Sequence, residues 1–308
     1  MVEHPPMRFV LEYPSELPAA SDDFLHPHVI RDIVAQAEES RFSGVALSEH
    51  PAPSLKWRTN GGHNTLDPIA ALSFMAGVTN EIKLVTNLYV LPFHTPYLSA
   101  KALGSLDIIS GGRLVAGVGA GYLRSEFSAV GVDFELRAAL FDEALAALRS
   151  IWTDAETPIR GRGFEATGPL WLQRPTQRPH PPIWIGGNSR AAMRRVVEYG
   201  DGWMPLIVDK SMASAIRTSA IETPAQFSEE LVVLRKRLAD AGRDPDSIDI
   251  QVVCPPTDLD DSASVRAARE FLDDLGARGA TWTVVHVDGS SPQAAVNYIK
   301  RFGEMFIG

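Results

Sequence analysis

A histidine and a carboxylate stand side by side at the end of a short apolar segment. The segment Gly44–Ser48 (GVALS) predicts a strand, and Glu49 and His50 close it. An imidazole titrates near neutral pH and can accept or donate a proton there. His50 is the one histidine in the sequence that combines a strand-end position with an adjoining carboxylate. We therefore interpret His50 as a candidate acid or base and the other histidines as structural.

A glycine-rich segment follows a later strand, Arg113–Val118, and is suited to contact a ligand. Glycine lets a ligand approach the backbone closely. The dinucleotide fingerprint G-x-G-x-x-G is not met, because Tyr122 or Arg124 stands where its last glycine is required, and because that motif belongs to the first βα unit of its domain. Tight packing of small residues is the alternative interpretation. The candidate ligand contacts are Gly119, Ala120, Gly121 and Tyr122.

A third candidate site has the features of an anion-binding turn. A strand at Ile183–Ile185 leads into a helix that starts near Ser189 and stops before Gly200. The free N–H groups and the positive end of a helix N-terminus attract anions. Phosphate sites of barrel enzymes commonly occupy such late βα loops, which favours phosphate over a plain capped turn. The candidate residues are Gly186, Gly187, Asn188 and Ser189.

Other chemistries are not supported by the sequence. The single cysteine, Cys254, lies in an apolar segment and is interpreted as a buried thiol. No HExxH or CxxC spacing predicts a metal site, and no G-x-S-x-G surrounds Ser189. The net charge of −9 disfavours nucleic-acid binding. Because no secretory signal or apolar stretch of bilayer length is found, we expect a cytoplasmic protein that acts on a small molecule and has no membrane partner.

Apolar strand-like segments alternate with amphipathic helix-like ones along almost the whole chain. About eight βα units without a paired hairpin predict a (β/α)8 TIM barrel with insertions, in one domain over residues 1–308. Ile82–Leu91 is predicted as one strand. The Pro-rich segment Thr157–Pro182 is predicted as an extended excursion, and the segment around Lys210–Thr223 as a polar loop.

Taken together, these segments resemble the bacterial luciferase-like monooxygenase superfamily, and within it most closely the deazaflavin (coenzyme F-420)-dependent oxidoreductases. The resemblance covers most of Arg41–Leu206 and is carried by SEHPAP, LDxxSGGR, GVGAGYLRSEF and PPIWIGG…GDGW in this order. The last hundred residues match only in pattern. The resemblance implies a TIM barrel with a flavin or deazaflavin ring at the carboxyl ends of the strands.

The resemblance also implies roles for individual residues. His50 matches a histidine beside the reactive ring, and Glu49 would orient it or contact the cofactor. Gly119–Tyr122 would run along the ring or its ribityl chain, and Gly186–Ser189 would hold the phosphate. The family's bulge, which contains a non-prolyl cis peptide behind the ring, falls on Thr86, Asn87 and Leu88.

Two positions depart from relatives in the superfamily. Tyr122 stands where some deazaflavin dehydrogenases have an acid, which argues against a sugar-phosphate dehydrogenase. Pro51 stands where flavin luciferases often have a second histidine, which favours the deazaflavin branch.

We therefore predict an oxidoreductase that transfers a hydride between a small organic substrate and coenzyme F-420. An FMN-dependent monooxygenase is the alternative on the same barrel. Rivals from other classes are a non-catalytic flavin- or deazaflavin-binding barrel and a barrel acting on a phosphorylated metabolite. Because family members usually pair, a homodimer is expected. Four loop residues on the active face either line the substrate pocket or have no role: Trp57, Arg58, Lys210 and Arg217.

Overall fold

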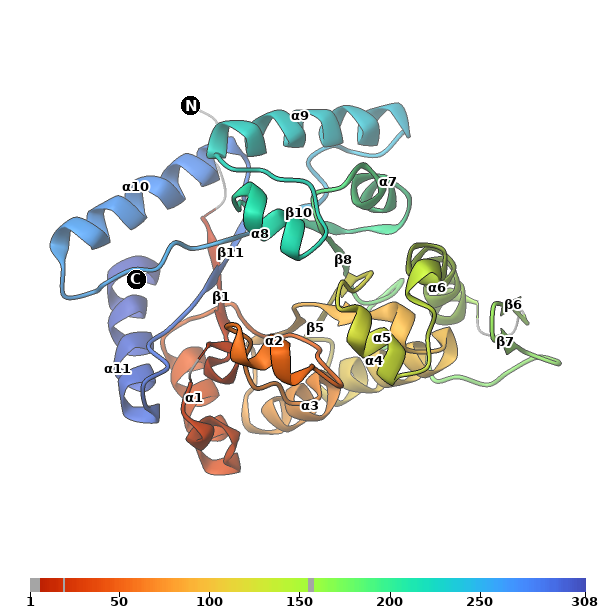
Figure 1. Cartoon of the computed structure of the whole chain (residues 1–308), viewed down its shortest axis with the longest axis horizontal. Coiled ribbons are helices and arrows are strands. Elements are labelled where there is room, and N and C mark those ends of the chain that lie inside the picture. Colours follow the sequence, from red (N-terminus) through yellow and green to blue (C-terminus); the bar gives the residue numbers. More distant parts are fainter. Residues whose placement is uncertain (1–5, 19, 155–157) are drawn as a thin grey trace.

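Eight parallel strands close into a barrel in the described part of the computed structural model, which comprises residues 6–18, 20–154 and 158–308. Neighbouring strands pair in the order β3-β2-β1-β11-β10-β9-β8-β5, and pairing of β3 with β5 closes the ring. Figure 1 shows the barrel from one end, with helices around it. The strands are β1 (Arg8–Glu12), β2 (Gly44–Leu47), β3 (Lys83–Thr86) with its continuation β4 (Tyr89–Val90), β5 (Leu114–Gly119), β8 (Ile183–Gly186), β9 (Gly202–Met204), β10 (Asp249–Val253) and β11 (Trp282–Val285).

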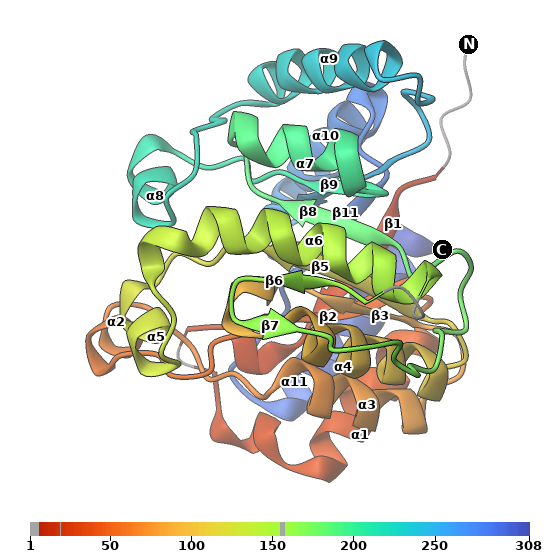
Figure 2. The ribbon, with the colours of Figure 1, turned by 90° about the vertical axis from the view of Figure 1, so that its right-hand side faces the viewer.

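Long helices alternate with these strands and cover the outside of the barrel, as Figure 2 shows from the side. Each strand is buried on both faces, which explains the near-continuous apolar strand segments of the sequence. The (β/α)8 prediction is thus confirmed. The helices are α1 (Pro27–Glu39), α3 (Pro68–Val78), α4 (Pro96–Ile109), α6 (Arg137–Thr153), α7 (Arg190–Tyr199), α9 (Pro224–Asp240), α10 (Ser262–Arg278) and α11 (Pro292–Phe302).

Side chains fill the interior of the barrel, so the barrel is a core and not a channel. The rings of Trp184 and Trp282 meet edge to face with centroids 5.2 Å apart. Gly117 leaves room for the Thr86 carbonyl, because a Cβ there would lie 2.1 Å from that oxygen. A ligand can therefore enter only at an end of the barrel. The interior cluster consists of Val10, Ala46, Val85, Val115, Trp184, Met204, Trp282 and Val284, with Leu88 packed against it.

Several helices begin where the sequence places a cap followed by proline. The Asp67 carboxylate accepts a hydrogen bond from the N–H of Ala70, and Pro68 occupies the first turn of α3. Thr223 and Ser291 cap α9 and α11 in the same way. None of the described helices is long and apolar enough to cross a membrane.

The structure corrects three local predictions. The strand predicted at Ile82–Leu91 is interrupted after Thr86 and resumes only as β4. The excursion before β8 contains an antiparallel hairpin of β6 (Arg160–Gly161) and β7 (Phe164–Glu165), although no hairpin was expected. Thr157, where the predicted segment begins, lies outside the described residues. The polar loop after β9 contains helix α8 (Lys210–Ala215).

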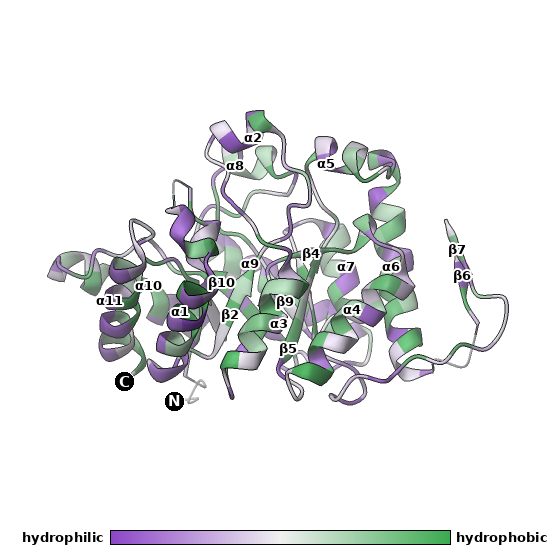
Figure 3. Ribbon diagram, turned by 90° about the horizontal axis from the view of Figure 1, so that it is seen from below, coloured by the Kyte–Doolittle hydropathy of each residue, from purple (hydrophilic) through white to green (hydrophobic). Residues whose placement is uncertain are grey.

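Three short helices gather at one end of the barrel, as Figure 3 shows. They are α2 (Leu55–Thr59), α5 (Arg124–Ala129) and α8. Each has at most six residues, which is too short for a helical period to be recognised in the sequence. They follow β2, β5 and β9, so they surround the carboxyl ends of the strands.

Candidate active site

A cavity of about 530 Å³ opens at the carboxyl ends of the barrel strands. Its volume is within the range of roughly 300–1,000 Å³ that is usual for small-molecule sites. Another hollow, of about 480 Å³, lies between residues 256–260 and α11; it shares His286 with the first and contains no predicted site residue. The predicted residues that line the first cavity are Glu49, His50, Asn87, Leu88, Gly119, Ala120, Gly121, Tyr122, Gly186, Gly187 and Ser189.

The imidazole of His50 is held by a carboxylate and an indole. Its Nδ1 lies 3.1 Å from Oε2 of Glu126 on α5, and the two side chains are only 9% and 2% exposed. The Trp57 ring, on α2, lies with its centroid 4.5 Å from that of the imidazole. Since a carboxylate only accepts hydrogen bonds, Nδ1 carries the shared hydrogen, and Nε2 is left as the nitrogen available to a substrate.

Glu49 does not have the orienting role that was expected for it. Its Oε2 accepts a hydrogen bond of 2.6 Å from the N–H of Val90, and its Oε1 lies 2.6 Å from Nε2 of His94. The side chain ties the end of β2 to β4, and Glu126 orients His50 instead. Glu49 still borders the cavity, so contact with a cofactor stays a prediction.

Two further polar rings surround His50. The centroid of His63 lies 5.5 Å away and that of Tyr122 6.1 Å away. Burial lowers the pKa of His63, so its imidazole is neutral at neutral pH. Burial raises the pKa of Tyr122, so its phenol keeps its proton and can donate a hydrogen bond.

A second carboxyl group, Glu16, borders the same cavity. Burial raises its pKa to about 8, and the negative charge of Glu12 acts in the same direction. Its Oε2 accepts a hydrogen bond of 2.9 Å from the N–H of Ser48, whereas Oε1 is buried without a hydrogen-bond partner in the described part of the chain. With its pKa raised in this way, Glu16 is expected to hold a proton at pH 7.

The wall of the cavity contains the expected cis peptide, between Asn87 and Leu88. The Leu88 side chain fills the space beside two glycines: a Cβ on Gly119 would lie 2.8 Å from its Cδ1, and one on Gly186 only 2.2 Å away. Thr86 does not reach the cavity, because its buried hydroxyl donates a hydrogen bond of 2.7 Å to the Gly117 carbonyl in the barrel interior.

The predicted phosphate turn lies at the start of α7. Gly187 has a φ of 104°, and the Ser189 hydroxyl accepts a hydrogen bond from the N–H of Ala192. The Asn188 side chain is directed away from the cavity: its Nδ2 donates to the carbonyls of Leu206 and Ser219. Asn188 therefore fixes the loop after β9, and the glycines with Ser189 and the free amides of α7 remain the candidate anion site.

The LDxxSGGR motif lies at the opposite end of the barrel, where it is structural. The buried Asp107 carboxylate accepts hydrogen bonds from the backbone and side-chain nitrogens of Gln177, at 3.0 and 2.7 Å. The Arg113 guanidinium donates to the carbonyls of Ala76 and Ser110, at 2.8 and 2.7 Å. The motif joins α3, α4 and the segment before β8. Such a structural role is typical of residues at the amino-terminal ends of the strands in these barrels.

The four loop residues predicted on the active face differ in position. Trp57 packs on His50, and Arg217 lines the cavity. The Arg58 guanidinium donates to the Gly62 carbonyl, and Lys210 is 83% exposed next to Glu222. Of the four, only Arg217 is among the described residues that line the cavity.

A family model described as luciferase-like monooxygenase matches residues 7–295 of this sequence. The chain belongs to the luciferase-like monooxygenase family. Its described structure is also similar to the crystal structure of monooxygenase RslO1 from Streptomyces bottropensis, with a TM-score of 0.80, 23% sequence identity and coverage of 98% of this chain and 99% of that one. This likeness concerns the fold.

Curated relatives of this luciferase-like chain include enzymes named for either of two cofactors. The F-420-dependent glucose-6-phosphate dehydrogenase of Gordonia bronchialis is 28% identical over 193 residues, covering 60% of this chain and 54% of the relative. The FMNH2-dependent dimethylsulfone monooxygenase of Pseudomonas putida is 30% identical over 135 residues, covering 43% and 37%. The chain spans about half the length of the curated relatives it matches.

Two carboxyl groups of this luciferase-like site were missed in the sequence. Glu126 stands four residues after Tyr122, within the GVGAGYLRSEF segment, and Glu16 stands in the loop after β1. Both follow barrel strands, so the strand-end rule that selected His50 would have included them. Cys254 is buried, as predicted, and burial raises its thiol pKa to about 12.

Proposed function

We propose that this protein catalyses hydride transfer between a small organic substrate and coenzyme F-420. The observation that carries the proposal is the His50–Glu126 pair, which borders the cavity at the strand ends. When bound, the deazaflavin ring accepts or supplies the hydride. The protein contributes binding, orientation and proton transfer.

The lining of the cavity fits a ring that carries a phosphate. Leu88, Val90 and Phe93 give one side an apolar surface, whereas the amides at the start of α7 suit an anion. The ring would lie against the segment from Asn87 to Leu88 and the phosphate at Gly187 and Ser189. The family's use of such cofactors supports this placement.

His50 exchanges the proton that accompanies the hydride. During oxidation of an alcohol, neutral Nε2 takes the hydroxyl proton, and the Glu126 carboxylate stabilises the imidazolium that forms. During reduction, the same atom returns the proton to the substrate oxygen. The protonated Glu16 and the Tyr122 phenol donate hydrogen bonds in the same cavity and help to orient a substrate oxygen.

An FMN-dependent monooxygenase is the second candidate. It is favoured by the relative from Pseudomonas putida and by the structural likeness to a monooxygenase. Pro51, at the position where flavin luciferases often have a histidine, favours the deazaflavin. Either assignment keeps His50 beside the ring.

Cofactor titration followed by turnover tests the proposal. Binding of coenzyme F-420 should lower the fluorescence of either the cofactor or the protein. A panel of alcohols, ketones and enones should then contain a substrate. His50→Asn should abolish turnover, whereas His28→Asn, at an exposed histidine on α1, should not. Tight FMN binding with no deazaflavin binding would contradict the proposal. Cofactor binding without turnover of any substrate would support the non-catalytic barrel.

We propose in addition that two copies pair in solution. Exposed apolar side chains on α3 and α4, including Phe74, Leu98 and Ile109, offer a surface that pairing would cover. Size-exclusion chromatography with light scattering measures the mass directly, and a monomer at micromolar concentration would contradict this part of the proposal.

A further inference from the structure

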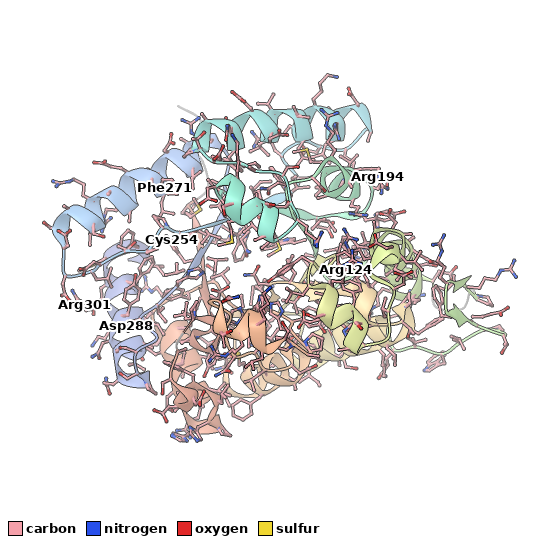
Figure 4. The ribbon with its side chains drawn as sticks, viewed as in Figure 1. Arg124, Arg194, Cys254, Phe271, Asp288 and Arg301 are labelled. Carbon is pink, nitrogen blue, oxygen red and sulfur yellow. The ribbon has the colours of Figure 1, made fainter. Side chains whose placement is uncertain are left out.

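Carboxyl groups and arginines line different parts of the cavity at the strand ends. The two arginines among the described lining residues, Arg195 and Arg217, follow β8 and β9. Figure 4 helps to locate the two sides of the barrel, with Arg194 on α7 and Asp288 in the loop after β11 on opposite sides. We call the part of the cavity wall that carries the carboxyl groups the acidic half. Its four members are Glu12, Glu16, Glu49 and Glu126.

The acidic half carries a net negative charge at neutral pH. Glu16 is expected to be protonated there, because burial raises its pKa to about 8. Burial lowers the pKa of His286, but the hydrogen bond to Glu12 and its negative charge outweigh this effect and raise it. The His286 imidazolium, with Nε2 at 2.7 Å from Oε2 of Glu12, thus compensates one carboxylate. Glu126 bonds His50, which takes up a proton only during the reaction, so its charge remains. An anion entering the acidic half would therefore be repelled.

Two oxygen atoms at the acidic half lack a close hydrogen-bond donor. Oε1 of Glu12 lies 3.4 Å from Nδ2 of Asn87, which is longer than a usual hydrogen bond, and the Glu12 side chain is 16% exposed. Asn87 also contacts Gln251, whose Nε2 lies 3.5 Å from Oδ1 of Asn87. Gln251 lines the cavity and is only 4% exposed, yet its Oε1 has no hydrogen-bond partner in the described part of the chain. Such oxygens accept hydrogen bonds, so a ligand with N–H or O–H donors would supply what the protein does not.

We propose that the acidic half selects substrates that carry a protonated amino group in addition to the reacting alcohol or ketone, with Glu12 as the specificity-determining residue. The inference rests on the proposed function and adds to it the class of substrate. The ammonium group donates to Oε1 of Glu12, while the reacting oxygen lies at Nε2 of His50. An ammonium has three donors and no acceptor, which suits this wall. Carboxylated and phosphorylated substrates are rejected, because the negative charges of the acidic half repel them.

Three alcohols of similar size and different charge test the inference. They are trans-4-aminocyclohexanol, which is a cation at pH 7, uncharged cyclohexanol, and anionic trans-4-hydroxycyclohexanecarboxylate. NMR titration of the cofactor-free protein would measure their affinities in dilute phosphate buffer, so that inorganic phosphate occupies the anion site at Gly187 and Ser189. The cation should bind about fivefold more tightly than cyclohexanol and the anion about fivefold more weakly, as for one partly exposed charge pair. Added salt should reduce both differences.

Variants of the pair assign the selection to Glu12. Glu12→Gln should bring the three affinities within about twofold of one another. His286→Gln removes the compensating charge and should increase the preference for the cation. Glu39→Gln, at an exposed carboxylate on α1, should keep the wild-type order. A different order in the wild type, an unchanged order in Glu12→Gln, or no increase in His286→Gln would overturn the inference.

Turnover separates this inference from the proposed function. The kcat/KM values of the three alcohols with coenzyme F-420 should follow the order of their affinities. Turnover without this order would overturn the inference and uphold the proposed function. If no alcohol or ketone is turned over with coenzyme F-420, the proposed function fails, whereas the NMR titrations still decide whether the cavity selects cations through Glu12.

Discussion

Replacing Glu16 by glutamine should make the protein more stable at neutral pH, by an amount that grows with pH. The carboxyl lies buried at the cavity, and one of its oxygens has no hydrogen-bond partner among the described residues. Burial raises its pKa from a usual value near 4.5 to about 8. Glutamine has the same size and can still accept the hydrogen bond from the N–H of Ser48. The variant therefore removes the ionisable group and little else.

The sign and size of the effect follow from proton linkage. In the unfolded chain Glu16 releases its proton near pH 4.5, whereas in the folded chain it holds the proton up to about pH 8. Between these values the unfolded state binds fewer protons, so the free energy of unfolding of the wild type falls as pH rises. At about 1.4 kcal/mol for each pH unit, the loss reaches about 3 kcal/mol by pH 7.

Thermal unfolding of the two proteins at several pH values measures this difference. For a chain of this length, about 3 kcal/mol corresponds to about 5 °C in Tm. The Tm of Glu16→Gln minus that of the wild type should be near zero at pH 4.5 and should increase up to pH 8. Glu39→Gln, at an exposed carboxylate at the end of α1, should show no such trend. A Tm difference that stays constant over this pH range would refute the reasoning.

Three other changes have expected outcomes of different kinds. Glu126→Gln should lower turnover about tenfold or more and alter the pH profile of turnover, because a neutral amide stabilises the His50 imidazolium less. Cofactor affinity should stay near that of the wild type. An unchanged pH profile would argue against a catalytic role of the His50–Glu126 pair. Arg113→Met leaves buried carbonyls unpaired and should lower the free energy of unfolding by about 3 kcal/mol in urea titrations without moving the cofactor Kd. Gly117→Ala places a Cβ 2.1 Å from the Thr86 carbonyl oxygen and should lower Tm, whereas Gly77→Ala, with open space around it, should not. Equal Tm values for the two variants would contradict the close packing of Gly117 against Thr86.

Much of the fold could be predicted from the sequence because its signals are local. Apolar segments buried on both sides, caps such as Asp67 before Pro68, and the alternation of strand and helix depend on neighbours a few residues away. The same alternation predicts where strands end, and therefore that His50 and Gly119–Tyr122 lie on one face of the barrel. The short helices α2, α5 and α8 were not predicted, because each has at most six residues, too few for a helical repeat of apolar residues to be recognised.

The sequence by itself determined the barrel, the end at which the cavity opens and the histidine that stands there. Only the tertiary structure decided which carboxylate forms a hydrogen bond with that histidine. Glu49 is adjacent in the chain yet bonds Val90 and His94, whereas Glu126 is 76 residues away and bonds His50. Burial of Glu16 and the gathering of carboxyl groups in the acidic half likewise depend on segments that meet only after the barrel closes. Side-chain direction and burial are set by such distant contacts, which spacing along a sequence does not specify.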